Sequence, residues 1–295
     1  MIRASIDLGT NTCLLLMREG DRVVGDYSTI VRLGQKVDEQ RALNPEAMER
    51  TLACLREYAK TLKAAGGRPE EAKCVATSQA RDARNGAEFF ERVRSETGFQ
   101  FQVISGEEEA RLTFLGALLP GMRPEASAVI DIGGGSTELI SATGGQSLDM
   151  GSVRFSERFL KSDPVTDAEF WACQAEADRM LETFQPWRLT QPLGTGLVAV
   201  AGTATTLAAW HLGLPRFDAR AMDGLVLTRG DIHRMVEELK WRSIEERRQL
   251  PSMEPLRADV ILAGALILWR AMEILKFPEA RISTRGLRYG LWLES

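Results

Sequence analysis

The first thirty positions alternate short apolar runs with small or charged residues, which is the pattern of strands joined by tight turns. Residues 3–8 and 12–17 are apolar and extended, and residues 22–27 form a third run of this kind. The segments between them are Gly9-Thr10-Asn11 and Glu19-Gly20-Asp21, both rich in residues that favour turns. The sequence therefore predicts three hairpin-linked strands at the start of the chain.

A helix is predicted next, because Asn44 and Pro45 supply a cap and a first-turn proline. Apolar side chains then recur every three or four positions through residues 48–62, which places them on one helical face. Gly66-Gly67 is expected to end this helix. The rest of the first half predicts strands at 74–76 and 101–104, and helices at 85–97 and from residue 107 onward.

The same pattern restarts near residue 123. Strands are predicted at 128–132, 137–141 and 147–150, with turns at Gly133-Gly134-Gly135 and Gly144-Gly145. Further along we expect helices around 166–184 and 230–247, a strand at 197–200, a long helix over 255–275 and a last strand at 281–283. Arg247-Arg248 is expected on a solvated helix face, paired with Glu245 and Glu246.

The two halves resemble one another, because Asp131 lies 124 positions after Asp7 in the same setting. Ile6-Asp7-Leu8-Gly9-Thr10-Asn11-Thr12 matches Ile130-Asp131-Ile132-Gly133-Gly134-Gly135-Ser136. Each half also has a later strand that ends at small residues, where a turn is expected. In the second half this turn is expected at Ala201-Gly202-Thr203.

This repeat predicts an α/β fold in which each half has a mixed sheet flanked by helices. The chain of 295 residues is long enough for two domains. We place them at residues 1–122 and 123–295, and expect the final helix to pack back on the first domain.

Composition and charge exclude several function classes. Hydrophobic residues make up 44% and charged residues 26%, no apolar run is long enough to span a membrane, and the net charge of −4 disfavours bulk nucleic-acid binding. The N-terminus enters a strand at once and lacks a signal-peptide layout, so we expect a cytoplasmic protein without nucleic-acid or membrane partners.

Cysteine and histidine usage leaves catalysis to carboxylates. Cys13, Cys54, Cys74 and Cys173 form no C-x-x-C pair and are expected as buried thiols rather than disulfides or zinc ligands. Only two histidines occur, which disfavours a histidine-based metal site or proton relay.

The two Asp-x-Gly turns carry the predicted chemistry. Small residues after a strand let several backbone N–H groups point outward as an anion-binding nest. A carboxylate beside phosphates implies an intervening cation such as Mg²⁺, or a role in positioning the attacking water. One such turn alone is equally well explained as a tight β-turn. Two copies, after Asp7 and Asp131, favour phosphate binding in a shared cleft.

Seven segments in order resemble one known family. They are residues 5–12, Val31-Arg32-Leu33-Gly34, residues 76–81, residues 104–112, residues 129–138, residues 201–205 and Arg257-Ala258-Asp259. Together they are similar to the exopolyphosphatase / guanosine pentaphosphate phosphatase family over nearly the whole chain. Asp-x-Gly turns alone also occur in acetate and sugar kinases, actin and heat-shock ATPases. The resemblance implies two ribonuclease H-like domains of the actin, hsp70 and sugar kinase superfold, with the active site between them.

The resemblance also implies roles for individual residues. Glu109 would be the catalytic base that activates water. Glu107 and Glu108 are rival candidates for this role, and the alternative for them is that they only interact favourably with the helix dipole. Arg81 and Arg257 would bind phosphate oxygens, with surface ion pairs as the alternative and Arg32 as a weaker candidate. Mg²⁺, or Mn²⁺ in its place, would be held near Asp7, Asp131 and Glu138, and Asp131 would also act in catalysis. The phosphate-binding set is Gly9, Thr10, Asn11, Thr12, Gly133, Gly134, Gly135, Ser136, Gly202 and Thr203.

The expected activity is hydrolysis of the terminal phosphoanhydride of inorganic polyphosphate. The alternatives left open are guanosine pentaphosphate 5′-phosphatase activity, a kinase of the same superfold, and a non-catalytic polyphosphate or nucleotide sensor. Long family members carry an extra helical C-terminal region that this chain lacks, so the chain resembles the short two-domain form. Chain-length preference and oligomeric state, including a homodimer, stay open.

Overall fold

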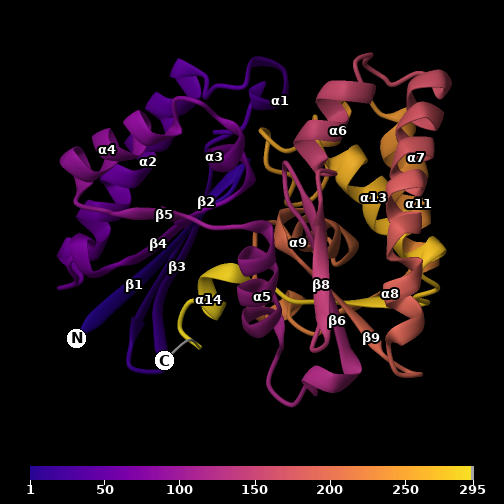
Figure 1. The fold of residues 1–295 in the computed structure, drawn as a ribbon. Helices are drawn as coiled ribbons and strands as arrows, with labels where there is room; N and C mark the ends of the chain where they lie inside the picture. The colour runs from indigo at the N-terminus through magenta and orange to yellow at the C-terminus, as the bar shows by residue number, and fades with distance from the viewer. Residues whose placement is uncertain (294–295) are drawn as a thin grey trace.

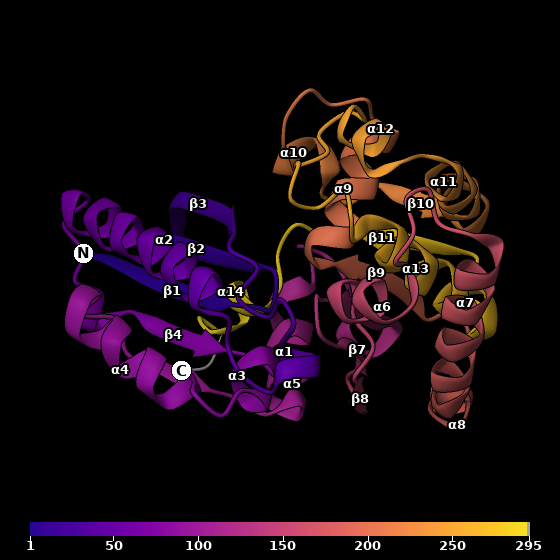
Figure 2. The ribbon, with the colours of Figure 1, turned by 90° about the horizontal axis from the view of Figure 1, so that it is seen from above.

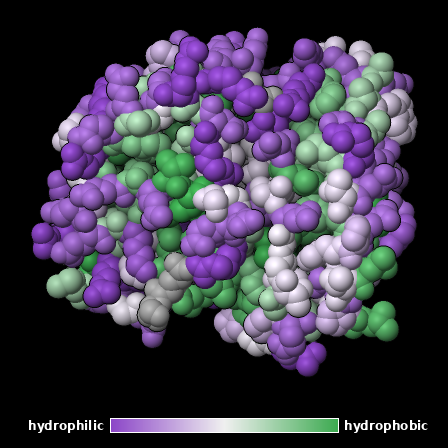
Figure 3. Space-filling view, in the orientation of Figure 1, coloured by the Kyte–Doolittle hydropathy of each residue, from purple (hydrophilic) through white to green (hydrophobic). Residues whose placement is uncertain are grey.

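Two mixed β-sheets form the centres of two lobes that lie side by side in the computed structural model (Figure 1, Figure 2). The structure describes residues 1–293, without the side chain of Asp38. Hydrophilic side chains cover most of the face shown in Figure 3. None of the helices in residues 1–293 combines the length and the hydropathy that a membrane-spanning helix needs.

The first sheet has the strand order β3-β2-β1-β4-β5. The first three strands pair in antiparallel fashion and the last two add in parallel, as a ribonuclease H-like sheet requires. Its strands are β1 (Ile2–Leu8), β2 (Thr12–Glu19), β3 (Arg22–Ile30), β4 (Lys73–Ala76) and β5 (Phe101–Val103). The helices of this half are α1 (Val37–Gln40), α2 (Pro45–Ala64), α3 (Ser78–Asp82), α4 (Gly86–Thr97) and α5 (Gly106–Ala117).

The second sheet repeats this arrangement in the order β10-β11-β9-β6-β7-β8, with β10 as an additional antiparallel edge strand. Its strands are β6 (Ser127–Ile132), β7 (Thr137–Ser141), β8 (Gly144–Leu148), β9 (Gly196–Val200), β10 (Val226–Thr228) and β11 (Glu279–Ile282). The helices are α6 (Ser152–Phe159), α7 (Asp167–Leu181), α8 (Gln185–Thr190), α9 (Ala201–His211), α10 (Ala219–Met222), α11 (Arg229–Trp241), α12 (Ile244–Arg248), α13 (Ile261–Ile274) and α14 (Leu287–Gly290). The expected pair of ribonuclease H-like α/β units is confirmed.

Strands β6 and β9 are apolar on both faces because both faces are covered. Ala128, Ile130 and Ile132 of β6 face the large core beneath α7, α9, α11 and α13. Val129 of the same strand faces the opposite way, where Ala110 and Phe114 of α5 pack on it. This continuous apolar run is the pattern expected for a central strand with helices on each side.

Helices α5 and α14 connect the two lobes. Leu112 of α5 packs with Leu287 and Leu291 against Val75 of the first sheet, while other side chains of α5 cover the second sheet. The C-terminal segment also bonds to β1, because the Ser5 hydroxyl donates to the carbonyl oxygen of Arg288 at 2.7 Å. Figures 1 and 2 show α14 between the first sheet and α5. The division at residue 122 stays a prediction.

Several expected boundaries were wrong for identifiable reasons. The long helix begins at Ile261 rather than at residue 255, because i→i−3 bonds such as that from the Val260 N–H to the Arg257 carbonyl make tighter turns there. Ser243 caps a separate helix α12, which divides the segment expected as one helix around 230–247. Gly144 and Gly145 belong to β8, so that strand begins three positions and ends two positions earlier than expected.

Two further local expectations also failed. The segment Ala201-Gly202-Thr203 is the first turn of α9 and follows β9 directly, with Ala201 at φ 66°. Arg247 is buried instead of solvated, and its Nε donates to the Leu239 carbonyl at 3.0 Å. Arg248 does form the expected exposed ion pair with Glu245.

Candidate active site

Asp7 and Asp131 stand near the ends of β1 and β6, and each is followed by a tight hairpin. In the first hairpin the Gly9 N–H donates to the Thr12 carbonyl at 2.9 Å. The equivalent bond in residues 133–136 measures 3.0 Å. The repeated sequence therefore folds into two equivalent turns, one from each lobe.

The two hairpins touch one another, and glycines make this contact possible. A Cβ atom on Gly134 would lie 2.9 Å from Cβ of Thr10, and one on Gly135 would lie 2.5 Å from the Ser78 hydroxyl oxygen. Thr10 is held in place by α3, because its hydroxyl lies 3.0 Å from that of Ser78 and donates to Gln79 at 3.2 Å. A side chain at either glycine would push the lobes apart.

A cleft of about 550 Å³ lies between the lobes and contains most of the predicted site. Its lining includes Asp7, Gly9, Thr10, Asn11, Thr12, Glu109, Asp131, Gly133, Gly134, Gly135, Ser136, Gly202 and Arg257. Three predicted site residues, Arg81, Glu138 and Thr203, do not line it. Thr203 is instead buried against Gly264 of α13, so only its backbone is available to the first turn of α9.

Asn11 points to a polar ligand in the cleft. Its side chain is buried, yet neither its amide nitrogen nor its amide oxygen has a hydrogen-bond partner. Leaving such a group unpaired costs on the order of 1–3 kcal/mol. A phosphate oxygen would accept from the Asn11 amide and remove part of that cost.

Arg257 is a buried cation in the cleft wall. Within residues 1–293 the only hydrogen bond of its side chain runs from Nη2 to the Thr12 hydroxyl at 3.5 Å, and no carboxylate is paired with the guanidinium. Burial lowers the pKa of this guanidinium below its usual range. The guanidinium lies directly over Gly202, where a Cβ atom would stand 2.0 Å from Nη1. A buried, unpaired arginine at the N-terminus of α9 is suited to an anion.

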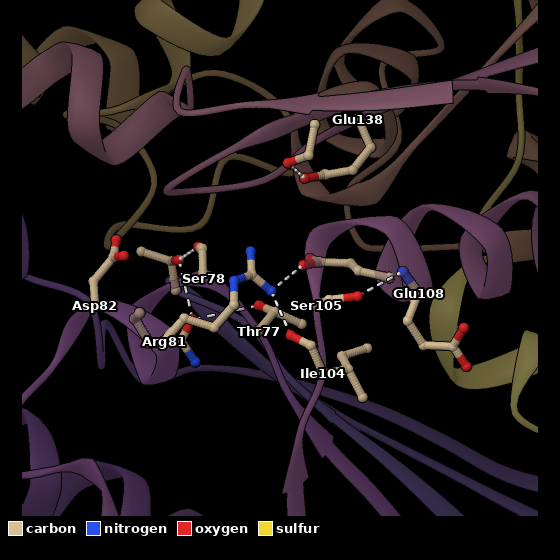
Figure 4. A network of polar contacts seen from close by, with 12 residues as sticks. Thr77, Ser78, Arg81, Asp82, Ile104, Ser105, Glu108 and Glu138 are labelled. Atoms are coloured by element: carbon tan, nitrogen blue, oxygen red, sulfur yellow. Dashed lines mark hydrogen bonds and ion pairs between the residues drawn. The ribbon is translucent and has the colours of Figure 1, made fainter. Parts of the chain in front are cut away.

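Glu109 is the one acidic residue of the first turn of α5 that is buried and lines the cleft. The Arg81 guanidinium donates from Nη1 to Glu109 Oε2 at 3.0 Å and to the Ile104 carbonyl at 2.7 Å (Figure 4). Burial raises the pKa of Glu109, while Arg81 lowers it. Of the two rivals, Glu108 pairs with Arg111 at the surface and Glu107 is exposed.

Four carboxylates repel one another in this region, of which Glu109 and Glu138 are buried and Asp7 and Asp131 are half-buried. Burial, together with the charges of Glu109 and Asp131, raises the pKa of Asp7 to about 8. Burial and the charge of Glu109 raise the pKa of Asp131 to about 7. Burial also raises the pKa of Glu138 well above its usual range. Such clusters of perturbed acids in a cleft are typical of functional sites.

Glu138 lies beside the cleft instead of in its wall. It is the cross-strand neighbour of Asp131, and its carboxylate accepts a 2.6 Å hydrogen bond from the Ser147 hydroxyl. Figure 4 shows it on its strand across from Arg81. Its position is therefore that of a supporting carboxylate close to Asp131.

The interlobe contacts around the cleft rest on ion pairs. Arg32 of the first lobe pairs with Asp259 of the second, so Arg32 faces a carboxylate. Arg154 of the second lobe donates to Asp82 of the first at 2.9 Å and from Nε to the Gly135 carbonyl at 2.8 Å. These pairs hold the hairpins of the two lobes against each other.

The comparisons with known proteins agree with this geometry. The Ppx/GppA phosphatase family matches residues 18–295. The chain belongs to this family. A curated relative of this Ppx/GppA phosphatase, from Mycobacterium tuberculosis and named exopolyphosphatase 2, is 36% identical over 288 residues, 90% of this chain and 88% of the relative.

Two solved structures of family proteins are similar over their full length. An exopolyphosphatase-like protein superposes with a TM-score of 0.90 and 31% identity, covering 100% of this chain and 98% of that one. The type II variant of the Ppx/GppA phosphatase from Aquifex aeolicus gives a TM-score of 0.75 and 34% identity, covering 99% and 98%. The resemblance seen in the sequence motifs is thereby confirmed.

Arg288 is a cleft residue that sequence reasoning missed. It reaches the cleft from α14 and forms a bidentate pair with Asp26 of β3, at 2.8 and 3.0 Å. Its charge lowers the pKa of Asp7, against the effect of burial. No local pattern indicates this role, because Arg288 and Asp26 are 262 positions apart. The contact depends on the return of α14 to the first sheet.

The residues of this Ppx/GppA phosphatase fit a magnesium ion that is shared with a substrate. Within residues 1–293 no three histidine, cysteine or acidic side chains converge to hold a metal by themselves. Mg²⁺ usually keeps several waters and binds one or two carboxylates plus phosphate oxygens. Asp7 and Asp131 supply two hard oxygen donors in the cleft, and a cation bound there would stabilise their ionised forms, which burial and the neighbouring carboxylates disfavour.

Proposed function

We propose that this protein is an exopolyphosphatase, which hydrolyses the terminal phosphoanhydride of inorganic polyphosphate and releases orthophosphate. The observation that supports this most strongly is that Glu109 and Arg257 line the same cleft. One is a buried carboxylate, and the other is a buried arginine with no acidic partner among residues 1–293. That is the arrangement needed to attack one phosphorus of a polyanion.

The polyphosphate end would bind to fixed donors from both lobes. The Gly9 and Gly133 N–H groups close the two turns, and the other N–H groups of residues 9–12 and 133–136 would form two nests, with a third set around Gly202 in the first turn of α9. The Asn11 amide and the Arg257 guanidinium add side-chain donors. These groups hold the terminal phosphate without reorganisation, which is where most of the acceleration in phosphoryl transfer comes from.

Asp7 and Asp131 would hold Mg²⁺, or Mn²⁺ in its place, against the phosphate chain, with Glu138 as a supporting carboxylate. The ion would neutralise charge on the bridging and non-bridging phosphate oxygens. Without it, two carboxylates of the cleft would face a polyanion directly. The chain's own residues account for the remaining steps.

Glu109 would act as the base. A water molecule between its carboxylate and the terminal phosphorus would lose a proton to Glu109 as its oxygen bonds to phosphorus. The bond from phosphorus to the bridging oxygen breaks, and the shortened chain leaves with the electron pair. Arg81 would act through Glu109 as a positioning residue, since its guanidinium bonds that carboxylate and lies outside the cleft wall.

The test is phosphate release by the purified protein with Mg²⁺ from long polyphosphate, short polyphosphate and guanosine pentaphosphate. We expect release from polyphosphate, and a loss of roughly 100-fold or more in Glu109→Gln. The matched control is Glu108→Gln on the same helical turn, which removes an exposed acid paired with Arg111 and should keep full turnover.

Each other outcome rejects the proposal in a distinct way. Full turnover in Glu109→Gln would remove Glu109 from the mechanism. Release from guanosine pentaphosphate alone would assign nucleotide 5′-phosphatase activity. ATP formed from ADP and polyphosphate would indicate a kinase, and tight polyphosphate binding without release would indicate a sensor.

A further inference from the structure

The cleft continues outward from the two hairpins along strand β3. Its outer part is lined by Asp26, Tyr27, Ser28, Arg216, Phe217 and Arg285. Ile30 of β3 is the register partner of Thr12 at the first hairpin, and Asp26 lies four residues before Ile30. Four strand residues span about 13 Å, so the cleft extends well beyond the hairpin itself. Figure 2 shows β3 and α10 on the two lobes that flank this outer part.

Arg216 is an exposed cation in the outer part of the cleft. It comes from the segment between α9 and α10, and within residues 1–293 its side chain has neither a hydrogen bond nor an ion pair. A guanidinium stays charged at every physiological pH and presents a planar fork of donors. Arg216 is therefore free to bind an anion that enters the cleft.

Arg285 is a second cation with unused donors. It lies on the segment that crosses from β11 to α14, and its side chain is 33% exposed. The carboxylate paired with it is that of Asp223, but Nε and Oδ2 are 3.9 Å apart, which is too long for a hydrogen bond. The Thr284 N–H donates to Asp223 at 2.7 Å, so the crossing segment is held beside the end of α10.

Arg288 extends this set of cations toward the inner site. Its Nε and Nη2 are bound to Asp26 and to the Thr284 carbonyl. Its Nη1 has no hydrogen-bond partner among residues 1–293 and is not one of the enclosed polar atoms, so this nitrogen is accessible from the cleft. Since Arg288 also acts on the charge of Asp7, it lies between the inner and the outer part.

Positive charge exceeds negative charge only in the outer part of the cleft. In the inner part Arg257 is accompanied by the three carboxylates described above. In the outer part three arginines are accompanied by two carboxylates that line the cleft, Asp26 and Glu254. A polyanion whose end is bound at the hairpins therefore finds complementary charge for its following groups in the outward direction.

We propose that Arg216, Arg285 and Arg288 form an arginine track for the phosphates that follow the terminal one, so that the protein prefers long polyphosphate to tripolyphosphate. This inference rests on the proposed function and adds a chain-length preference to it. The guanidinium groups would bind non-bridging phosphate oxygens through charge-assisted hydrogen bonds. Tripolyphosphate, with its three phosphates at the inner site, gains least from the track.

The experiment measures phosphate release by the full chain with Mg²⁺ from tripolyphosphate and from long polyphosphate. The readout is kcat/KM for the long chain divided by kcat/KM for tripolyphosphate. Arg216→Gln should lower this ratio about two- to fivefold, mainly through a higher KM for the long chain, because one exposed charge contact is weak. The double variant with Arg285→Gln should lower the ratio further, and added salt should reduce the difference from the unchanged protein.

Arg220→Gln is the matched control, because Arg220 is also exposed but lies in α10 and outside the cleft lining. It should keep the ratio of the unchanged protein, and thermal unfolding should be the same in Arg216→Gln and Arg220→Gln. A ratio that stays constant in Arg216→Gln and in the double variant would overturn the proposal. An equal fall in Arg220→Gln would also overturn it, since net charge alone would then explain the effect.

Binding of fluorescently labelled long polyphosphate, followed by anisotropy, separates the arginine track from the proposed function. If the unchanged protein releases no phosphate from any chain, the proposed function fails, but the binding measurement still tests the track. Weaker binding by Arg216→Gln than by Arg220→Gln would support the track, and equal binding by the two variants would overturn it.

Discussion

The guanidinium of Arg81 on α3 donates a 3.0 Å hydrogen bond to the buried carboxylate of Glu109 on α5. These two residues come from separate elements, and the same guanidinium is fixed by the Ile104 carbonyl at 2.7 Å. The pair therefore sets both the direction and the charge of the carboxylate that faces the cleft. This relationship makes the pH dependence of turnover sensitive to a residue that does not line the cleft.

Arg81→Gln should lower turnover and shift its pH profile. A base must be ionised to accept a proton, so activity is lost as pH falls through the pKa of Glu109. Burial raises that pKa and Arg81 lowers it, so removal of Arg81 should move the acidic limb to higher pH. We expect about a 10-fold to 100-fold loss near neutral pH, with partial recovery in alkaline buffer.

The measurement is kcat against pH for Arg81→Gln beside the unchanged protein. Arg111→Gln is the control, because Arg111 pairs with the exposed Glu108 on the outer side of the same helix. An acidic limb that stays in place in Arg81→Gln would contradict the assigned role.

Asp7 should make the metal-free protein less stable as pH rises. Its folded pKa of about 8 lies above the ordinary value of 3.8, so the folded state binds more protons than the unfolded state between these values. The contribution of Asp7 to stability is therefore greatest below about pH 4 and is lost progressively up to about pH 8. Asp7→Asn should remove this loss and be more stable than the unchanged protein at pH 8, by on the order of a few kcal/mol.

Denaturant unfolding at pH 5 and pH 8 with a chelator tests this expectation. Asp21→Asn is the control, because its side chain is fully exposed. Added Mg²⁺ should stabilise the unchanged protein at pH 8 and have little effect on Asp7→Asn. Equal stabilisation of both by Mg²⁺ would exclude Asp7 as a ligand.

The two aspartates and their hairpins could be predicted because strand, turn and repeat are local patterns. Asp7 and Asp131 lie at the ends of apolar runs, and the glycines that follow reveal a turn in any context. The α/β arrangement follows from the same periodicity. The order of strands in each sheet is the one found in ribonuclease H-like folds.

The misses occurred where tertiary contacts override local preference. Residues 255–260 continue an apolar helical pattern, yet they form tight turns that direct Arg257 toward Thr12. Arg247 lies in a segment with the composition of a surface helix, but its side chain is buried. Arg288 could not be placed at all, since its role depends on a distant strand. The position of Arg288 was thus harder to predict than the positions of the two aspartates.

Gly202→Ala should impair turnover without unfolding the protein. A Cβ atom there would stand 2.0 Å from Nη1 of Arg257, so the guanidinium must leave its position over the first turn of α9. Loss of one fixed donor to the transferring phosphate should cost on the order of 100-fold in kcat. Because Gly202 lies in the first turn of α9, alanine suits its backbone and the melting temperature should change little.

Gly196→Ala is the matched control, because it lies at the start of β9 with open space around its Cβ position. Both variants should be assayed for phosphate release and thermal unfolding. Undiminished kcat in Gly202→Ala would show that the position of Arg257 does not matter for the reaction.

Gly116→Ala should destabilise the protein although it improves helix propensity. Ala is favoured over Gly by about 1 kcal/mol inside a helix such as α5. A Cβ atom at this position would, however, lie 2.1 Å from the Gly286 carbonyl oxygen and 2.4 Å from the Gly290 nitrogen. Both are backbone atoms, so the clash is relieved only if α14 moves away. Overpacking of this kind costs typically 1–3 kcal/mol, and here the clash with fixed backbone should exceed the gain.

Gly230→Ala separates the two effects. Gly230 lies in the first turn of α11, and the nearest atom to its Cβ position is the Thr228 hydroxyl oxygen at 3.7 Å. It should therefore leave stability unchanged or raise it, while Gly116→Ala lowers the urea midpoint by an amount equivalent to about 2 kcal/mol. Since α14 carries Arg288 into the cleft, Gly116→Ala should also weaken substrate binding. A Gly116→Ala protein as stable as Gly230→Ala would mean that the α5–α14 contact does not hold the lobes together.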